Sequence, residues 1–348
     1  MNTKKFSLFT IGIMLLGLII FAIPTIIIDP YFHYHAPLKN LEYPINNQRY
    51  QNDGMLKHFS YDAMIIGTSM TLNFKPDEFD KLFDVNSLHV SFLGGSYKEI
   101  GDNMMTGLKY NPDIKIILRG LDLSHLDDDK DYLKGEKSSY PTYLYDANIF
   151  NDIEYLWNKE VFDKTFEVFE HTKKVRESSY VEKEEMPVYG KEIVLESFDR
   201  IAPSGAIVEF TEEDKERVLA NIRQNVTSAA EKYPDVTFYY FWTPYSICYW
   251  DEICLGGKVD YMLEAETVAI EEMLKYENIR LFSFADNFDL VCNLDNYCDQ
   301  GHYSPHINSK ILEWIRNGEY ELTAENYKAH IADRKDFYKQ YDYDAIYK

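Results

Sequence analysis

Five short apolar runs, separated by helix-like segments, constrain the fold of this chain more than any other feature. The runs span residues 63–66, 87–92, 114–118, 236–241 and 279–284. Each has the length of a buried strand, and the first two lead into glycines, at Gly67 and at Gly94-Gly95. Strands that alternate with helices form a mostly parallel sheet covered by helices on both faces. The sequence therefore predicts an α/β domain with a sheet of about five strands.

Helical patterns fill most of the intervals between these runs. They span residues 76–83, 97–110, 211–232, 259–276 and 305–316. Thr211 and Asp214 resemble a capping box with Asp in place of Glu, and Ser304-Pro305 has the form of a helix start. The rhythm breaks between residues 124 and 203, a charged, Tyr-rich stretch with one helix expected over 158–176. We interpret this stretch as an insertion that carries substrate-facing elements, such as a lid.

The N-terminal segment predicts attachment to a membrane. Residues Ser7 to Ile28 carry no charge and are numerous enough to cross a hydrocarbon core of about 30 Å. Lys4 and Lys5 precede the segment, so the positive-inside rule places residues 1–6 in the cytoplasm and the rest of the chain outside the cell membrane. A cleaved signal peptide is the alternative, but its apolar region is usually shorter and ends at a small-x-small site. We therefore expect a single uncleaved anchor over residues 7–28.

The remaining organisation follows from these two signals. We expect a polar, aromatic stalk over residues 29–60, the α/β domain over 61–322 and a polar tail over 323–348. The formal net charge of −22 argues against nucleic acid as a partner, because phosphate binding requires clustered Lys and Arg. Four cysteines form two C-x5-C pairs, Cys248/Cys254 and Cys292/Cys298. Their even number predicts disulfides in an oxidising compartment, with zinc binding and free thiols as alternatives.

Candidate catalytic residues stand where strands of such a sheet end, which is where α/β proteins collect their active residues. Ser69 follows the first strand, at the start of a turn whose backbone N–H groups favour a developing oxyanion. A helix N-cap is the alternative role for this serine. Asp299 and His302 form a D-x-x-H turn that can supply a carboxylate and an imidazole to one site. A solvated loop is the alternative, and a metal site shared by His302 and His306 is disfavoured by the intervening Pro305.

Taken in chain order, these segments resemble the SGNH, or GDSL-type, superfamily of esterases and acyltransferases. The resemblance rests on Ser69 in I-I-G-T-S after the first strand, Gly94-Gly95 after the second and D-x-x-H near the C-terminus. It implies the SGNH hydrolase fold, a flavodoxin-like three-layer sandwich, over roughly residues 62–316. It also implies that Ser69 is the nucleophile, His302 the base and Asp299 the acid, with Gly95 or Gly94 in the oxyanion hole.

One segment departs from the pattern of this superfamily. After the third strand the family usually has G-x-N-D, whose Asn donates a hydrogen bond to the oxyanion, whereas this chain has Arg119-Gly120-Leu121-Asp122. An ionised Asp122 cannot donate a hydrogen bond and would oppose an oxyanion. Either Arg119 replaces the Asn or Asp122 has a structural role. Residues 242–246, after the fourth strand, are a further candidate pocket wall.

The single N-terminal anchor is similar to that of a membrane-tethered branch of the superfamily, which includes the D-alanyl-lipoteichoic acid protein DltD and the alginate O-acetylation proteins. This resemblance implies an extracytoplasmic O-acyltransferase or esterase that acts on a cell-envelope polysaccharide or a teichoic-acid-like polymer, beside a membrane-bound O-acyltransferase. Neither a cofactor nor a metal is expected. A non-catalytic glycan-binding module or a scaffold subunit of a cell-wall acylation complex is the alternative.

Overall fold

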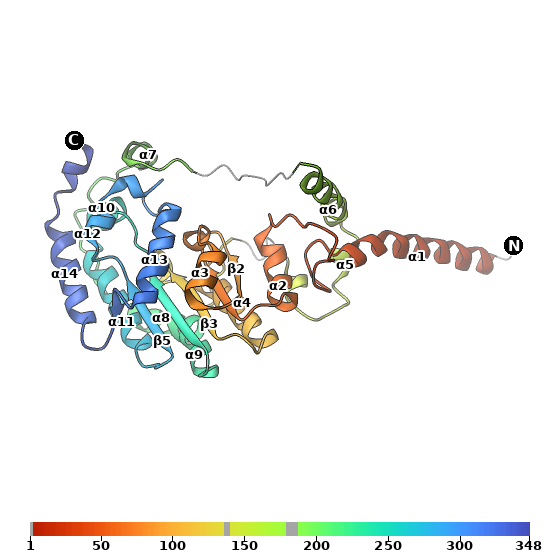
Figure 1. Ribbon diagram of the computed structural model, residues 1–348, viewed down its shortest axis with the longest axis horizontal. Coiled ribbons are helices and arrows are strands. Elements are labelled where there is room, and N and C mark those ends of the chain that lie inside the picture. Colours follow the sequence, from red (N-terminus) through yellow and green to blue (C-terminus); the bar gives the residue numbers. More distant parts are fainter. Residues whose placement is uncertain (1–2, 136–139, 179–186) are drawn as a thin grey trace. The chain divides into compact units, whose positions relative to one another are not determined.

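The computed structural model describes residues 3–135, 140–178 and 187–348, which fall into two compact units (Figure 1). One unit comprises Met1–Ser60 and Glu136–Glu185, and the other comprises Tyr61–Gly135 and Met186–Lys348. The predicted insertion over 124–203 thus contributes to both units, and its residues 136–139 and 179–186 lie outside the described part.

The second unit contains a six-stranded sheet in the order β2-β1-β3-β4-β5-β6. Its strands are β1 Ala63–Gly67, β2 Ser87–Ser91, β3 Ile116–Leu121, β4 Thr237–Trp242, β5 Ile279–Ser283 and β6 Glu321–Leu322. The first five are parallel, and β6 is antiparallel to β5. These five strands confirm the predicted mostly parallel α/β sheet. β6 was not predicted, because two residues are too few to show an alternating pattern.

Helices connect these strands. They are α3 Pro76–Phe83, α4 Tyr97–Tyr110, α7 Lys191–Ser197, α8 Glu212–Ile222, α9 Ser228–Lys232, α10 Ile247–Leu255, α11 Val259–Met273, α12 Phe288–Val291, α13 Pro305–Asn317 and α14 Tyr327–Gln340. A π-helical turn, Arg223–Thr227, joins α8 to α9 where one continuous helix was predicted. The predicted capping box is present, since Thr211 accepts a hydrogen bond from the Asp214 backbone N–H and the Asp214 side chain accepts one from the Thr211 backbone N–H. The helices predicted over 76–83 and 97–110 have the expected bounds.

Helix α14 packs through a buried ion pair rather than through an apolar stripe. Arg334 donates a 2.6 Å hydrogen bond to Glu266 of α11, and neither side chain is exposed. The Trp250 ring of α10 stacks on Tyr338 with 4.0 Å between ring centroids. A buried charge requires a partner of opposite sign, so this pair defines where α14 docks.

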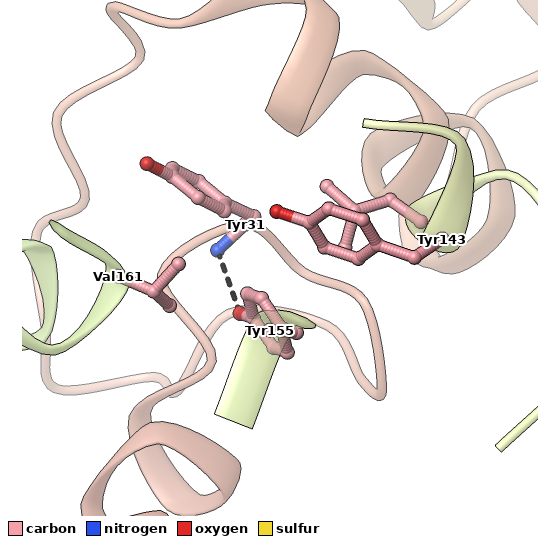
Figure 2. Packing of buried hydrophobic residues seen from close by; sticks show 5 residues of the cluster. Tyr31, Tyr143, Tyr155 and Val161 are labelled. Atoms are coloured by element: carbon pink, nitrogen blue, oxygen red, sulfur yellow. Dashed lines mark hydrogen bonds between the residues drawn. The ribbon is translucent and has the colours of Figure 1, made fainter. Parts of the chain in front are cut away.

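The first unit is built around the outer end of a long apolar helix. It contains α1 Thr3–Ile28, α2 Gln48–His58, α5 Ile153–Leu156 and α6 Lys159–Ser178. Its core includes Tyr31, Tyr143, Tyr155 and Val161, and Figure 2 shows the Tyr31 backbone N–H donating to the Tyr155 hydroxyl at 3.3 Å. The buried Asp29 carboxylate, directly after α1, accepts a 2.6 Å hydrogen bond from the same Tyr155 hydroxyl. The chain after α1 and the segment before α6 are thereby joined in one core.

Helix α1 is, within the described residues, the one helix that is long and apolar enough to cross a membrane. Its length and composition fit a membrane anchor and a signal sequence alike. The predicted apolar N-terminal helix is therefore confirmed as a helix.

The predicted disulfides are wrong, because all four cysteines are free thiols. Cys248 and Cys254 both lie in α10, and six residues of helix separate their Cα atoms by about 9 Å along the axis. A disulfide requires Cα atoms within about 7 Å of each other. Burial raises the pKa of the Cys292 and Cys298 thiols to about 11, so both stay protonated at neutral pH.

Candidate active site

The carboxyl ends of three neighbouring strands bring together the residues that follow them. In the register of the sheet, Ile66 of β1 pairs with Arg119 of β3, and Leu121 of β3 pairs with Trp242 of β4. Thr68, Asp122 and Thr243 therefore leave the sheet at the same edge. The chain passes from β1 to β2 on one side and continues through β3 on the other, so this edge is a topological switch point, where open α/β sheets bind ligands.

Ser69 begins a tight 3-10 turn, Ser69–Thr71, directly after β1. Thr68 is the N-cap of this turn and accepts a hydrogen bond from the Met70 backbone N–H. A Cβ atom on Gly67 would lie 2.5 Å from the Thr71 methyl carbon, so the turn can fold back on the strand because residue 67 is glycine. The cap role that was the alternative for Ser69 thus belongs to Thr68, and the Ser69 hydroxyl is directed elsewhere.

The structure brings Ser69, His302 and Asp299 into one hydrogen-bonded line. Ser69 Oγ lies 2.7 Å from His302 Nε2, and His302 Nδ1 lies 2.7 Å from Asp299 Oδ2. The other oxygen of Asp299 accepts hydrogen bonds from the backbone N–H groups of Gly301 and His302. A carboxylate at Nδ1 holds the proton on that nitrogen, which leaves Nε2 free to accept the serine proton.

The electrostatics of this line suit a base that works near neutral pH. Burial by itself would raise the pKa of Asp299, but hydrogen bonds from the His302 side chain and from two backbone N–H groups lower it to about 2. The hydrogen bond from Asp299 raises the pKa of His302 above its ordinary value of 6.5, against the opposing effect of burial. Asp299 is therefore ionised throughout the physiological range, and the imidazole readily holds a proton taken from a hydroxyl.

The D-x-x-H turn is fastened by backbone and hydroxyl contacts, and not by the disulfide expected at Cys298. Tyr297 and Tyr303 form an antiparallel bridge across the turn, and the Cys298 backbone N–H donates to the His302 carbonyl at 3.0 Å. The buried Tyr303 hydroxyl donates to the Met70 carbonyl at 3.0 Å, within the serine turn. Ser246, after β4, donates to the Gln300 carbonyl at 2.7 Å. The acid–base turn is thus tied directly to the nucleophile turn.

Asp122 is a buried carboxylate that three hydroxyl groups surround. Its Oδ2 accepts a 2.7 Å hydrogen bond from Thr68, and its Oδ1 accepts hydrogen bonds from Tyr245 at 2.7 Å and Thr243 at 3.1 Å. These donors stand at the ends of β1 and β4, so Asp122 ties the nucleophile turn to the neighbouring loop. An ionised carboxylate with three neutral donors is satisfied without taking up a proton.

The glycines and Arg119, expected at the oxyanion hole, occupy different places. Gly94 lines the cavity and has a left-handed backbone, φ 59°, whereas the Gly95 backbone N–H donates to the Phe92 carbonyl at 2.7 Å. Arg119 is buried, and its guanidinium donates to the Asn225 carbonyl at 2.5 Å, so it is held in the interior. Toward the part of the chain that the structure describes, the backbone N–H groups of Ser69 and Gly94 make no hydrogen bond. These two N–H groups are therefore the best-placed oxyanion donors.

A cavity of about 500 Å³ opens over Ser69. It is lined by Thr68, Ser69, Met70, Gly94, Asp122, Ser124, His125, Ser197, Phe198, Asp199, Ile201, Tyr245, Tyr249, Glu252, Asp299, Gln300, Gly301 and His302. Residues 197–201 form one wall, and Tyr245, Tyr249 and Glu252 form another. The predicted wall over 242–246 thus supplies Tyr245, while Trp242 is wholly buried. Four of the lining residues are carboxylic acids, so the cavity repels anions.

Several residues of this site escaped the sequence analysis. Thr68, Thr243 and Tyr303 position the reacting groups through hydroxyl hydrogen bonds, and Tyr249 and Glu252 line the cavity from the unpredicted helix α10. The one available signal was a hydroxyl residue directly after each strand end, a pattern too common to single out. His306 bonds to Ser304 Oγ at 2.7 Å, and no three His, Cys, Asp or Glu side chains in residues 3–135, 140–178 and 187–348 come together as metal ligands.

Comparison with known proteins adds little to this geometry. No family model matches the sequence, and no curated protein matches it. A solved structure from Streptococcus pneumonia, described as a "putative platelet activating factor", aligns with 78% of this chain and 90% of its own length, with 12% sequence identity and a TM-score of 0.39.

Proposed function

We propose that the chain is a serine acyl-ester enzyme of the SGNH type, with Ser69 as nucleophile, His302 as general base and Asp299 as the acid that orients it. The observation that carries this proposal is the hydrogen-bonded line from Ser69 Oγ through both nitrogens of His302 to Asp299. The strand order β2-β1-β3-β4-β5 supports a flavodoxin-like arrangement of layers, in which this edge of the sheet binds the ligand.

In the first half-reaction His302 Nε2 takes the proton of Ser69 as the serine oxygen attacks the carbonyl carbon of an ester. The negative charge that develops on the carbonyl oxygen is stabilised by the backbone N–H groups of Ser69 and Gly94. The bond from the carbonyl carbon to the leaving oxygen then breaks, and His302 gives its proton to that oxygen. The product is an acyl ester on Ser69 and a free alcohol.

In the second half-reaction an acceptor hydroxyl replaces the leaving alcohol, and the same steps run in reverse. Water as acceptor makes the chain an esterase, and a sugar hydroxyl makes it an O-acyltransferase. Tyr245, Tyr249 and Phe198 supply aromatic walls, which suit a sugar ring. The acidic cavity and the net charge of −22 favour a neutral glycan over a polyanionic, teichoic-acid-like acceptor.

The proposal also includes an extracytoplasmic location. Helix α1 supports it by its length and composition, and Lys4 and Lys5 at its start support a cytoplasmic N-terminus. An anchored enzyme stays beside a membrane acyl donor, and a membrane-bound O-acyltransferase would supply such a donor.

Pre-steady-state kinetics with a nitrophenyl acetate ester test the chemistry. The full chain is expected to release a burst of nitrophenolate equal to the number of active sites, because the acyl-enzyme forms faster than it is consumed. Ser69→Ala should abolish the burst, and Ser197→Ala, on the opposite cavity wall, is the matched control that should retain it. The absence of a burst and of any acyl-enzyme, together with glycan binding that survives Ser69→Ala, would favour the non-catalytic glycan-binding or scaffold alternative.

A further inference from the structure

The segment just before α6 exposes large apolar side chains beside the outer half of α1. Ile149, Phe150 and Ile153 are 73%, 83% and 60% exposed, and Trp157 is 38% exposed. We call these four residues the 149–157 patch. Side chains of this size seldom gather on a surface that faces water, so such a patch marks a contact with another apolar phase.

The patch is fixed to α1 by specific contacts. The indole N–H of Trp157 donates to the Leu18 carbonyl at 3.0 Å, and the rings of Phe21 and Phe162 stack with their centroids 4.3 Å apart. Figure 1 shows α5 and α6 beside the end of α1 that is distant from the N-terminus. Because the Trp157 donor is satisfied by a backbone carbonyl, the indole can enter an apolar phase without leaving a polar group unpaired.

The position of Leu18 along α1 sets the depth of the patch. If the hydrocarbon core begins at Phe6, after the two lysines, its thickness of about 30 Å is spanned by about 20 residues and ends near Thr25. Leu18 then lies about 10 Å inside the outer boundary. That depth matches the roughly 5–10 Å to which interfacial elements bury their apolar faces, and Trp is enriched at this level.

The charged groups near the patch limit its insertion to the outer boundary. Asp152 lies within the segment but faces inward, where it accepts hydrogen bonds from the Tyr34 hydroxyl at 2.9 Å and from His33 Nε2 at 3.2 Å. Lys159 and Asp163, in the first turns of α6, are solvent-facing and paired with each other. An ion pair of this kind is accommodated among lipid headgroups but not in the hydrocarbon centre.

We propose that the 149–157 patch enters the outer leaflet beside α1, so that its occupant is the acyl-chain and glycerol region of the lipids there. The chain would then grip the bilayer at two places, by a spanning helix and by a shallow apolar segment. This inference rests on the membrane anchoring proposed above and is independent of the serine chemistry. A shallow second contact would restrict the tilt and rotation of the first unit relative to the membrane.

Depth-dependent fluorescence quenching tests this inference. The full chain is reconstituted into phosphatidylcholine vesicles with bromine atoms placed either near the glycerol or near the ends of the acyl chains, and flotation verifies attachment. We expect tryptophan emission to be quenched most by the shallow bromines. Trp157→Phe should remove this quenching, whereas Trp314→Phe, in α13 of the other unit, should leave it. Phe150→Trp in the Trp157→Phe background should restore it.

The outcomes separate the two proposals. A chain that floats with the vesicles but shows the same quenching with and without Trp157 would overturn the inference and leave the anchor intact. The same holds if Trp157 is shielded from both bromine positions, as it would be by a membrane protein partner or a second copy. A chain that does not float would overturn the anchor as well, while the ester burst in detergent would still report on the serine chemistry.

Discussion

The cavity has a floor and a wall, and each is organised by one carboxylate. The floor lies at the ends of β1, β3 and β4, where Asp122 is 4% exposed and accepts hydrogen bonds from three hydroxyl groups. The wall is the turn from Asp299 to His302, where the carboxylate accepts hydrogen bonds from two backbone N–H groups and one imidazole. The Asp299 side chain keeps 39% of its surface exposed.

The comparison teaches that the donors of a carboxylate decide what it can do. Thr and Tyr hydroxyls do not take up a proton near neutral pH, so the hydrogen bonds around Asp122 fix geometry and nothing more. An imidazole changes its charge in that range, so the bond from Asp299 to His302 also governs proton transfer. The floor therefore positions the serine, and the wall carries its proton.

The largest effect should come from removing the base in the wall. We expect His302→Ala to lower kcat for a nitrophenyl ester by about 10⁴- to 10⁶-fold, because the serine then has no proton acceptor. The imidazole is half-exposed, so the thermal unfolding temperature should change little. A variant that retains more than a tenth of the wild-type kcat would remove His302 from the mechanism.

Asp299→Asn should cost about 10³- to 10⁴-fold in kcat, because the amide no longer holds the imidazole in the correct tautomer. It should also move the acidic limb of the kcat/KM profile. Wild-type activity requires neutral His302, whose raised pKa places that limb above pH 6.5. Loss of the carboxylate lowers this pKa, so the limb should shift to lower pH in the variant. An unchanged limb would show that Asp299 does not act on His302.

The floor should respond differently. Asp122→Asn keeps the shape of the side chain but loses its charge, so we expect unfolding to become easier by about 1–3 kcal/mol, measured by denaturant titration. A displaced Thr68 would shift the serine turn and lower kcat by about ten- to a hundredfold. The acidic limb should move down less than in Asp299→Asn, because Asp122 is the weaker influence on the pKa of His302. A larger shift would reverse the assigned roles.

The smallest effect should come from the link between the two regions. Tyr303→Phe removes the hydroxyl that donates to the Met70 carbonyl, and we expect it to cost about 1 kcal/mol in stability. The loss in kcat should stay within about tenfold, without a shift of the acidic limb. Tyr343→Phe, whose hydroxyl donates to the Tyr338 carbonyl, is the matched control. It should cost similar stability but leave kcat unchanged.

Much of the fold was predictable because each buried strand left a local pattern. The runs at 63–66 and 279–284 needed only their apolar length, and Pro76 and Asn111-Pro112 marked helix ends. Helix α14 could not be predicted in this way, because it docks through the Arg334–Glu266 pair, which joins positions far apart in the sequence. The disulfide prediction failed for a related reason: the spacing of Cys248 and Cys254 does not reveal that one helix holds them apart.

The candidate site was predictable where each residue belongs to a motif. Ser69, Asp299 and His302 stand in recognisable positions after strands, and the structure brings their side chains together. The oxyanion donors could not be assigned from sequence, because Gly94 and Gly95 differ only in which backbone N–H is already used. The role of Asp122 was equally hidden, since its three hydroxyl partners come from separate strand ends.

The most direct test of the account is covalent labelling of the full chain with a fluorophosphonate, followed by peptide mass spectrometry. This reagent reacts with serines that a neighbouring base activates. The account predicts a single adduct on Ser69, formed in the wild type and in Tyr343→Phe and absent in His302→Ala. An unlabelled Ser69, or labelling that is equally fast without His302, would contradict it.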